Sequence, residues 1–328
     1  MNTENTHIID SFDAKKRLDV WLAIQTDVSR SKIQKYIKKV GVKKNGELVS
    51  VPHNFLDEGD EVEIPKSFEI KEEDLLVKPN LEETATMKIK KEKKGKKVDF
   101  KIIFENKDVI VVNKDAGVLV HPTDSSNEET MMDAAVAYDP KIAMVGDKPE
   151  QRAGIVHRLD RMTSGVMIIA RNQEAFLDLK NKFARRFVRK KYHALLNGSL
   201  DKDHEVLRFK IARSKDLGRM VARPEQQPGK EAITEFNVLE RYANATEVDI
   251  DMHTGRTHQI RAHFHALGNP VVGDELYIIR KQKTIKLDRL WLHAYHLELS
   301  LPGENKASVF TAPVPRKLTK LTESLHKV

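Results

Sequence analysis

Apolar and polar positions follow two different spacings along the chain, and each spacing predicts a different kind of element. Short runs rich in β-branched residues predict strands at 109–112, 165–170, 188–195 and 246–252. Helical spacing instead marks 172–186, whose inward face would carry Ala175, Phe176, Leu179 and Phe183. A helix is also expected at 257–267, ended by Gly268. The larger part of the chain is therefore predicted to mix helices and strands.

The segment 14–65 has the pattern of a small separate domain. A helix is predicted to start after Ser29, a good N-cap residue, and to end at Gly41. Its apolar positions have helical spacing, at Ile33, Tyr36, Ile37 and Val40. The opposite face is basic, with Lys32, Lys35 and Lys39 and with Arg30 nearby. Asn45-Gly46 then predicts a hairpin turn between two short strands.

The remaining boundaries follow from changes in composition. Residues 66–99 begin acidic and end rich in lysine, which predicts a charged linker. The lysine-rich end acts either as a plain tether or as a contact for phosphates. Residues 100–315 would form the second domain, with an N-terminal tail at 1–13 and a C-terminal tail at 316–328.

Composition narrows the possible functions. The 328 residues include no cysteine, which excludes disulfides, thiolate zinc sites and a thiol nucleophile. No apolar run reaches the ~20 residues that span a bilayer, and no secretory signal begins the chain, so a cytoplasmic protein is expected. The net charge of +8 suggests a polyanionic partner.

The most informative segment is 157–165, a polar loop between two apolar runs. It places one carboxylate, Asp160, between Arg158 and Arg161. By charge alone this is either a surface turn with an ion pair or a functional loop held by a rigid scaffold.

The identities of these residues point to a function more specifically than their charges do. Four segments, 113–122, 157–165, 191–198 and 253–263, closely resemble, in this order, the signature elements of the RluA-type pseudouridine synthases, which isomerise uridine in structured RNA. One departure is Asp115, where the family usually has proline in a turn. The segment 14–65 resembles the S-four-type RNA-binding domain that commonly precedes these catalytic domains.

The resemblance implies an α+β fold with a mixed, largely antiparallel central sheet, flanking helices and a small N-terminal α+β RNA-binding domain. It implies three catalytic residues: Asp160 as the carboxylate, Arg261 as its partner, and Tyr192 beside the flipped base. Expected RNA contacts are Arg158, Arg161, Arg256 and His258, together with the basic helix face at Arg30, Lys32, Lys35 and Lys39. The residues leave open whether Asp160 attacks the base or the sugar or removes the ribose C2′ proton.

Pseudouridine formation is redox-neutral, so the resemblance implies neither a cofactor nor a metal. The competing metal site would use His253, His258, His263 and His265, whose spacing does not match His-Glu-x-x-His. No G-x-G-x-x-G motif or P-loop points to a nucleotide cofactor. The expected substrate is large-subunit ribosomal RNA. The protein is expected to be a monomer. Transfer RNA, or a non-catalytic role in RNA binding or ribosome assembly, is the alternative, and the modified uridine stays open.

Overall fold

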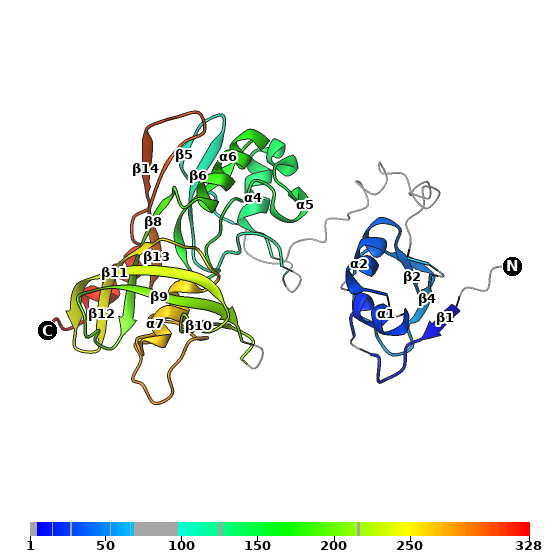
Figure 1. Cartoon of the computed structure of the whole chain (residues 1–328). Helices are drawn as coiled ribbons and strands as arrows, with labels where there is room; N and C mark the ends of the chain where they lie inside the picture. The colour runs from blue at the N-terminus through cyan, green and yellow to red at the C-terminus, as the bar shows by residue number, and fades with distance from the viewer. Residues whose placement is uncertain are drawn as a thin grey trace. The chain divides into compact units, whose positions relative to one another are not determined.

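The protein forms two compact units, Met1–Lys91 and Glu92–Val328, in a computed structural model (Figure 1). The structure describes residues 5–14, 16–26, 28–52, 54–65, 67–68, 98–123, 126, 128–214 and 217–328. Most of the predicted linker, including its lysine-rich part, lies outside the described residues. None of the described helices combines the length and the apolar character needed to cross a lipid bilayer.

The first unit is a small α+β structure. Its helices are α1 (Leu18–Thr26) and α2 (Arg30–Lys39). Four strands, β1 (Asn5–Ile8), β2 (Val42–Lys44), β3 (Glu47–Val49) and β4 (Glu61–Ile64), form an antiparallel sheet in the order β1-β4-β2-β3. Asn45 and Gly46 both have positive φ, as the predicted two-residue hairpin between β2 and β3 requires.

Helix α2 has the two faces that its spacing predicts. Ile33, Tyr36 and Ile37 are buried against Trp21 and Leu22 of α1. The basic residues of the other face are exposed, at Arg30, Lys32, Lys35 and Lys39. Ser29 occupies the N-cap position, although its side chain makes no capping hydrogen bond.

The N-terminal residues expected to be a tail carry regular structure. Residues 5–8 pair with β4 in antiparallel register, from Asn5 with Ile64 to Ile8 with Glu61. Ile9 follows the strand into the core and is 1% exposed. A four-residue strand is too short to show a clear alternation, so the sequence pattern alone does not reveal it.

The second unit is built on a ten-stranded sheet in the order β10-β9-β11-β12-β8-β13-β7-β6-β5, with β14 paired to β13. Its strands are β5 (Lys101–Glu105), β6 (Val109–Lys114), β7 (Ser164–Ala170), β8 (Arg189–Asn197), β9 (His204–Arg213), β10 (Met220–Arg223), β11 (Lys230–Tyr242), β12 (Ala245–Met252), β13 (Leu292–Ser300) and β14 (Ala307–Thr311). Every pairing between these strands is antiparallel except β13 with β7. This confirms the predicted mixed, largely antiparallel sheet.

Helices cover the sheet on both faces. They are α4 (Met131–Tyr138), α5 (Pro149–Arg152), α6 (Gln173–Ala184), α7 (Gln259–Ala266) and α8 (Arg316–Glu323), with the 3-10 helix η2 (Pro140–Met144). Helix α6 contacts β7, and α4 and α5 contact η2. Figure 1 shows α7 beside β9 and β10.

Alternate residues of β7 enter two different cores. Val166 and Ile168 pack with α6 residues such as Phe176, whereas Met167 and Ile169 join the core that includes Phe264 of α7. Burial on both faces explains why this strand is an uninterrupted apolar run.

Predicted and observed element ends differ by a few residues. The helix expected from residue 257 begins at Gln259, because His258 takes a left-handed conformation (φ 54°) as its N-cap. The helix expected at 172–186 spans Gln173–Ala184, with the Asn172 side chain accepting a hydrogen bond from the Ala175 amide. Such shifts are the usual uncertainty at element ends.

The C-terminal residues, also expected to be a tail, belong to the second unit. Leu318 of α8 is fully buried beside Trp291, whose indole N–H donates to the Leu318 carbonyl oxygen at 2.9 Å. The Val328 amide donates to the Arg241 carbonyl oxygen. The spacing of Leu318, Leu321 and Leu325 is the apolar stripe that marks this contact.

Gly165 lies where the polar loop enters β7, at the parallel pairing with β13. Its φ is +125°, and an added Cβ would lie 2.1 Å from the Ala294 carbonyl oxygen. Both the backbone conformation and the close approach therefore require glycine.

We expect Gly165→Ala to destabilise the second unit by roughly 3 kcal/mol, since backbone strain and overpacking add there. The matched control is Gly268→Ala, which also has positive φ (+86°) but no atom within 4 Å of the added Cβ. That control should lose only about 1 kcal/mol. Urea denaturation followed by circular dichroism measures both, and equal losses would contradict the close-approach argument.

Candidate active site

The loop that carries Asp160 is fixed to the core by its neighbours. Leu159 is 4% exposed within the main core, and Ser164 begins β7. The Thr163 amide donates to the Asp160 carbonyl oxygen at 3.1 Å, which makes the segment a tight turn. The Asp160 side chain keeps 17% of its surface exposed, so it is held in place and still open to a ligand.

Lys114, at the end of β6, holds this loop from inside. Its ammonium donates to the carbonyl oxygens of Asp115, Val118 and Arg161, at 2.9, 2.9 and 3.1 Å. The side chain is fully buried, and burial lowers the pKa of Lys114 to about 7, an effect that the Asp160 charge opposes. Lys114 thus connects the turn at 115–118 to the residue that follows Asp160.

His157 orients the start of the loop. Its Nε2 accepts a hydrogen bond from the Ile168 amide at 3.0 Å, and its ring stacks on Phe183 with centroids 4.5 Å apart. Burial, with Lys190 nearby, lowers the pKa of His157 to about 3, so the imidazole is neutral at physiological pH. His157 therefore positions the start of the loop as a neutral ring.

Arg261 lies between two carboxylates. Its Nη1 is 3.4 Å from Asp160 Oδ2, while its Nε and Nη2 donate to the two Asp274 oxygens at 2.7 and 2.9 Å. Burial opposes its charge, but the hydrogen bonds and charge of Asp274, with Asp160, leave the pKa of Arg261 raised. The bidentate contact with Asp274 fixes the guanidinium plane, and the remaining nitrogen faces Asp160.

Asp274 is itself firmly held. Its side chain has no exposed surface, and its Oδ1 also accepts from the amides of Leu276 and Tyr277. The Tyr277 ring lies 5.0 Å from the Arg261 guanidinium carbon in a cation–π contact. Asp274 was not predicted from the sequence, because nothing in the local spacing connects it to a helix residue thirteen positions earlier.

Tyr192, on β8, is buried at 5% exposure within the main core. Burial, and then the charge of Asp160, raise the pKa of its phenol. The hydroxyl therefore stays protonated at physiological pH, and the side chain lies near enough to Asp160 to feel its charge.

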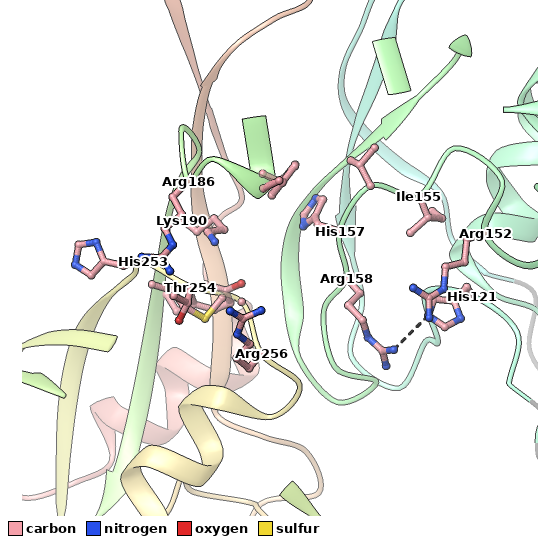
Figure 2. Close-up of a pocket in the computed structure, with 16 residues that line it drawn as sticks. His121, Arg152, Ile155, His157, Arg158, Arg186, Lys190, His253, Thr254 and Arg256 are labelled. Atoms are coloured by element: carbon pink, nitrogen blue, oxygen red, sulfur yellow. Dashed lines mark hydrogen bonds between the residues drawn. The ribbon is translucent and has the colours of Figure 1, made fainter. Parts of the chain in front are cut away.

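Two adjoining cavities meet at these residues. A small cavity of about 80 Å³ contains Asp160, Tyr192 and Arg261 in its lining. A larger one of about 330 Å³ shares with it Arg158, Tyr192, Met252, Gly255 and Arg256. Figure 2 shows the larger cavity between a wall with His157 and Arg158 and a wall with Lys190 and Arg256.

The predicted RNA-contact residues of this unit separate into two groups. Arg158, Arg256 and His258 line the small cavity. Arg158 Nη1 lies 3.3 Å from His121 Nε2 (Figure 2), Arg256 Nε donates to the Glu231 carbonyl oxygen, and His258 Nδ1 is 3.2 Å from the Tyr277 hydroxyl. Arg161 instead turns away, to the Gly117 carbonyl oxygen and to Glu128 at 2.9 Å.

The four histidines weighed as a metal site have different surroundings. His253 lies 2.8 Å from Glu235, and His263 is fully buried with its ring edge-on to Phe209. His258 and His265 both lie edge-on to the Tyr277 ring. In the part of the chain that the structure describes, no three metal-ligating side chains converge.

Gln259 is a second residue whose role was not predicted from the sequence. Its Oε1 accepts from the Thr254 hydroxyl and the Arg256 amide, and its Nε2 donates to the Ile233 carbonyl oxygen. The buried amide thereby shapes the loop 253–258 before α7. Its position inside the resembling segment 253–263 was the available signal.

Comparison with known proteins gives the fold a family. Residues 108–266 match the family model described as RNA pseudouridylate synthase. The solved structure of human RNA pseudouridylate synthase domain containing 1 superimposes with a TM-score of 0.57 at 29% identity, over 72% of this chain and 91% of that one. The fold and the site thus define a pseudouridine synthase.

Relatives that match over about nine-tenths of this chain define the family more closely. An RNA pseudouridine synthase of Aquifex aeolicus is 36% identical, over 92% of this chain and 91% of the relative. Ribosomal large subunit pseudouridine synthase D of Haemophilus ducreyi is 30% identical, over 94% and 90%. The chain belongs to the RluA-type RNA pseudouridine synthases, and it is an enzyme that isomerises uridine in RNA.

We expect Asp274→Asn to lower kcat by about 100-fold, because a misplaced catalytic contact can lose that much. KM for RNA should change little, since Asp274 lines neither cavity described above. The control is Asp249→Asn, which removes a carboxylate paired with Lys191 and Tyr295, away from Arg261. Steady-state kinetics on both variants tests this, and an unchanged kcat for Asp274→Asn would contradict it.

Proposed function

We propose that this enzyme converts uridine to pseudouridine in large-subunit ribosomal RNA, with Asp160 as its catalytic carboxylate. The observation that carries the assignment is the position of Asp160, which lies in the small cavity opposite an arginine that a second carboxylate holds in place. The ribosomal substrate is supported by relatives named ribosomal large subunit pseudouridine synthase D, in Haemophilus ducreyi and in Pasteurella multocida.

The reaction breaks the bond between N1 and C1′, turns the uracil and rejoins it through C5, so it needs no redox partner. A carboxylate next to the ribose can act as a nucleophile or as a base in the first step. Arg261 faces Asp160 with its Nη1 nitrogen and directs the carboxylate into the cavity. Neither role requires a metal or a nucleotide.

Tyr192 contributes as a neutral phenol. Its raised pKa keeps the proton on the hydroxyl, so we assign it to stacking and hydrogen bonding with the flipped uracil. Arg158 lies at the mouth shared by the two cavities and is exposed. A planar cation there can fill the gap that the uridine leaves in the RNA stack and offset part of the flipping energy.

The first unit supplies additional RNA affinity in this proposal. The exposed lysines of α2 form a basic surface opposite its apolar face, and attraction to phosphates needs no sequence-specific contact. Arg30 differs from the lysines, because its Nε is 2.9 Å from Asp19, a carboxylate with no exposed side-chain surface. We therefore assign Arg30 mainly to holding α2 against α1, and Lys35 and Lys39 to the RNA.

Asp160→Asn should lower tritium release from RNA labelled at uracil C5 by at least about a hundredfold, the lower range for losing a catalytic base or nucleophile. C5 loses its hydrogen when it becomes the glycosidic carbon, so release reports the isomerisation directly. RNA binding should persist. The matched control, Asp201→Asn, changes an exposed carboxylate and should retain wild-type activity.

The same assay tests the substrate. Release from ribosomal RNA of the large subunit, with none from transfer RNA, is the expected result. Release from transfer RNA alone would keep the enzyme and replace the substrate. Full activity of Asp160→Asn would remove this carboxylate from the mechanism.

Replacing Lys35 and Lys39 together by alanine should raise KM for RNA and leave kcat unchanged. For each lysine that no longer neutralises a phosphate, the dependence of log Kd on log salt concentration should fall by about 0.8, hence by about 1.6 for the pair. The control pair is Lys107 and Lys306, two exposed lysines of the second unit. An identical salt dependence in the two double variants would argue against an RNA contact by α2.

A further inference from the structure

The larger cavity is unusually basic. One wall carries Arg152 and Arg158, and the other carries Arg186, Lys190 and Arg256 (Figure 2). The described residues that line it include three histidines but no Asp or Glu. A cavity of about 330 Å³ lined by five cations is suited to an anion, and its volume is in the range of small-ligand pockets.

The five cations differ in what they already contact. Arg186 pairs with Glu231 at 2.7 Å, and Arg256 Nε donates to the Glu231 carbonyl oxygen. Arg158 contacts His121. Among the residues that the structure describes, the side chains of Arg152 and Lys190 have neither a hydrogen bond nor an ion pair. Arg152 is exposed, whereas Lys190 is half-buried.

The next residue along β8 shows the contrast. Lys191 points to the opposite face of the sheet, where its Nζ lies 2.9 Å from Asp249 and 3.7 Å from Asp251. A buried cation without a partner is unfavourable, so the fold keeps Lys190 at a cost in stability. Such a cost is typical of groups kept for ligand binding.

The position of the larger cavity indicates which anion it binds. It shares Arg158, Tyr192, Gly255 and Arg256 with the cavity around Asp160, so a chain whose target uridine occupies the small cavity continues directly into the large one. The negatively charged groups of RNA are its phosphodiesters. We propose that the larger cavity binds the phosphodiester next to the target uridine, with Lys190 as its principal cation. This inference rests on the proposed function of Asp160.

The charge state of Lys190 gives the proposal a pH signature. Burial, and then the charge of Arg186, lower the pKa of Lys190 to about 8. The other titratable or charged residues that line the same cavity are His121, Arg152, His157, Arg158, Tyr192, His253 and Arg256. The adjoining groove adds Arg189, Arg208, Glu235 and Asp251, of which Glu235 pairs with His253 and Asp251 with Arg189.

In the free enzyme Lys190 therefore loses its proton as pH rises through about 8, whereas a bound phosphodiester keeps it charged. KM should rise across this range and kcat should not. Arginine at the same position remains charged throughout.

The experiment compares Lys190→Met, Lys190→Arg and Lys191→Met with the wild type in the tritium-release assay. At pH 7 we expect Lys190→Met to raise KM about tenfold, as for the removal of one charged hydrogen bond, with kcat kept. Its salt slope should fall by about 1. Lys190→Arg should restore KM and remove the rise in KM above pH 8. Ionisation of the RNA bases would affect Lys190→Arg and the wild type alike, so it cannot account for a difference between them. Lys191→Met removes one charge from the opposite face and should behave as wild type.

Each outcome bears on one proposal. Unchanged KM and salt slope for Lys190→Met, in an active and folded enzyme, would overturn the phosphodiester site and leave the role of Asp160 intact. Loss of kcat with unchanged KM would overturn it too, because Lys190 would then act on the chemistry. Equal effects of Lys190→Met and Lys191→Met would overturn the phosphodiester site, because a loss of net charge would then explain the result. No tritium release by the wild type would instead contradict the proposed function.

Discussion

The site depends on one buried cation shared unequally by two carboxylates. Asp274 neutralises Arg261 through a bidentate contact and has no exposed side-chain surface, so this pair stays fixed. A buried charge with its partner removed would be strongly destabilising, which ties the pair to the stability of the fold. Asp160, at 3.4 Å and partly exposed, takes the weaker share of the same cation. Arg261 therefore orients the Asp160 carboxylate and leaves it open to react with a substrate.

The sheet makes this arrangement possible by bringing distant segments together. Asp160 precedes β7, Tyr192 lies on β8, and β13 pairs with both strands. The parallel contact of β7 with β13 is so close at Gly165 that no side chain fits there. Lys114, reaching in from β6, connects the neighbouring turn to the loop. Apart from the hydrogen bond of Lys114 to its neighbour Asp115, these contacts join segments far apart in the sequence, so the site exists only in the folded unit.

What the sequence could predict was local. Helical spacing predicted the helix that carries Arg261, and its apolar residues Ile260 and Phe264 are buried in the core. Asn45-Gly46 fixed a hairpin through its own backbone preference. The roles of Asp274 and Lys114 were not predicted, because they depend on partners that no local sequence pattern indicates. The strand at 5–8, which pairs with β4, was missed because four residues show no clear alternation. Helix α8 was missed although its leucine spacing forms an apolar stripe, and its contact with Trp291 is a distant one.

Unequal pairing also explains how one strand serves two purposes. Along β8, Lys191 and Arg189 point to acids on β12, and those ion pairs belong to the structure of the sheet. Lys190 and Tyr192 point the other way, into the two cavities, where Asp160 is the one carboxylate among the described lining residues. The alternation of a strand thus separates satisfied charges from unsatisfied ones by a single residue. An excess of unpaired positive charge beside a single directed carboxylate is what a polyanionic substrate requires, since the phosphates hold the chain while the carboxylate stays free to react.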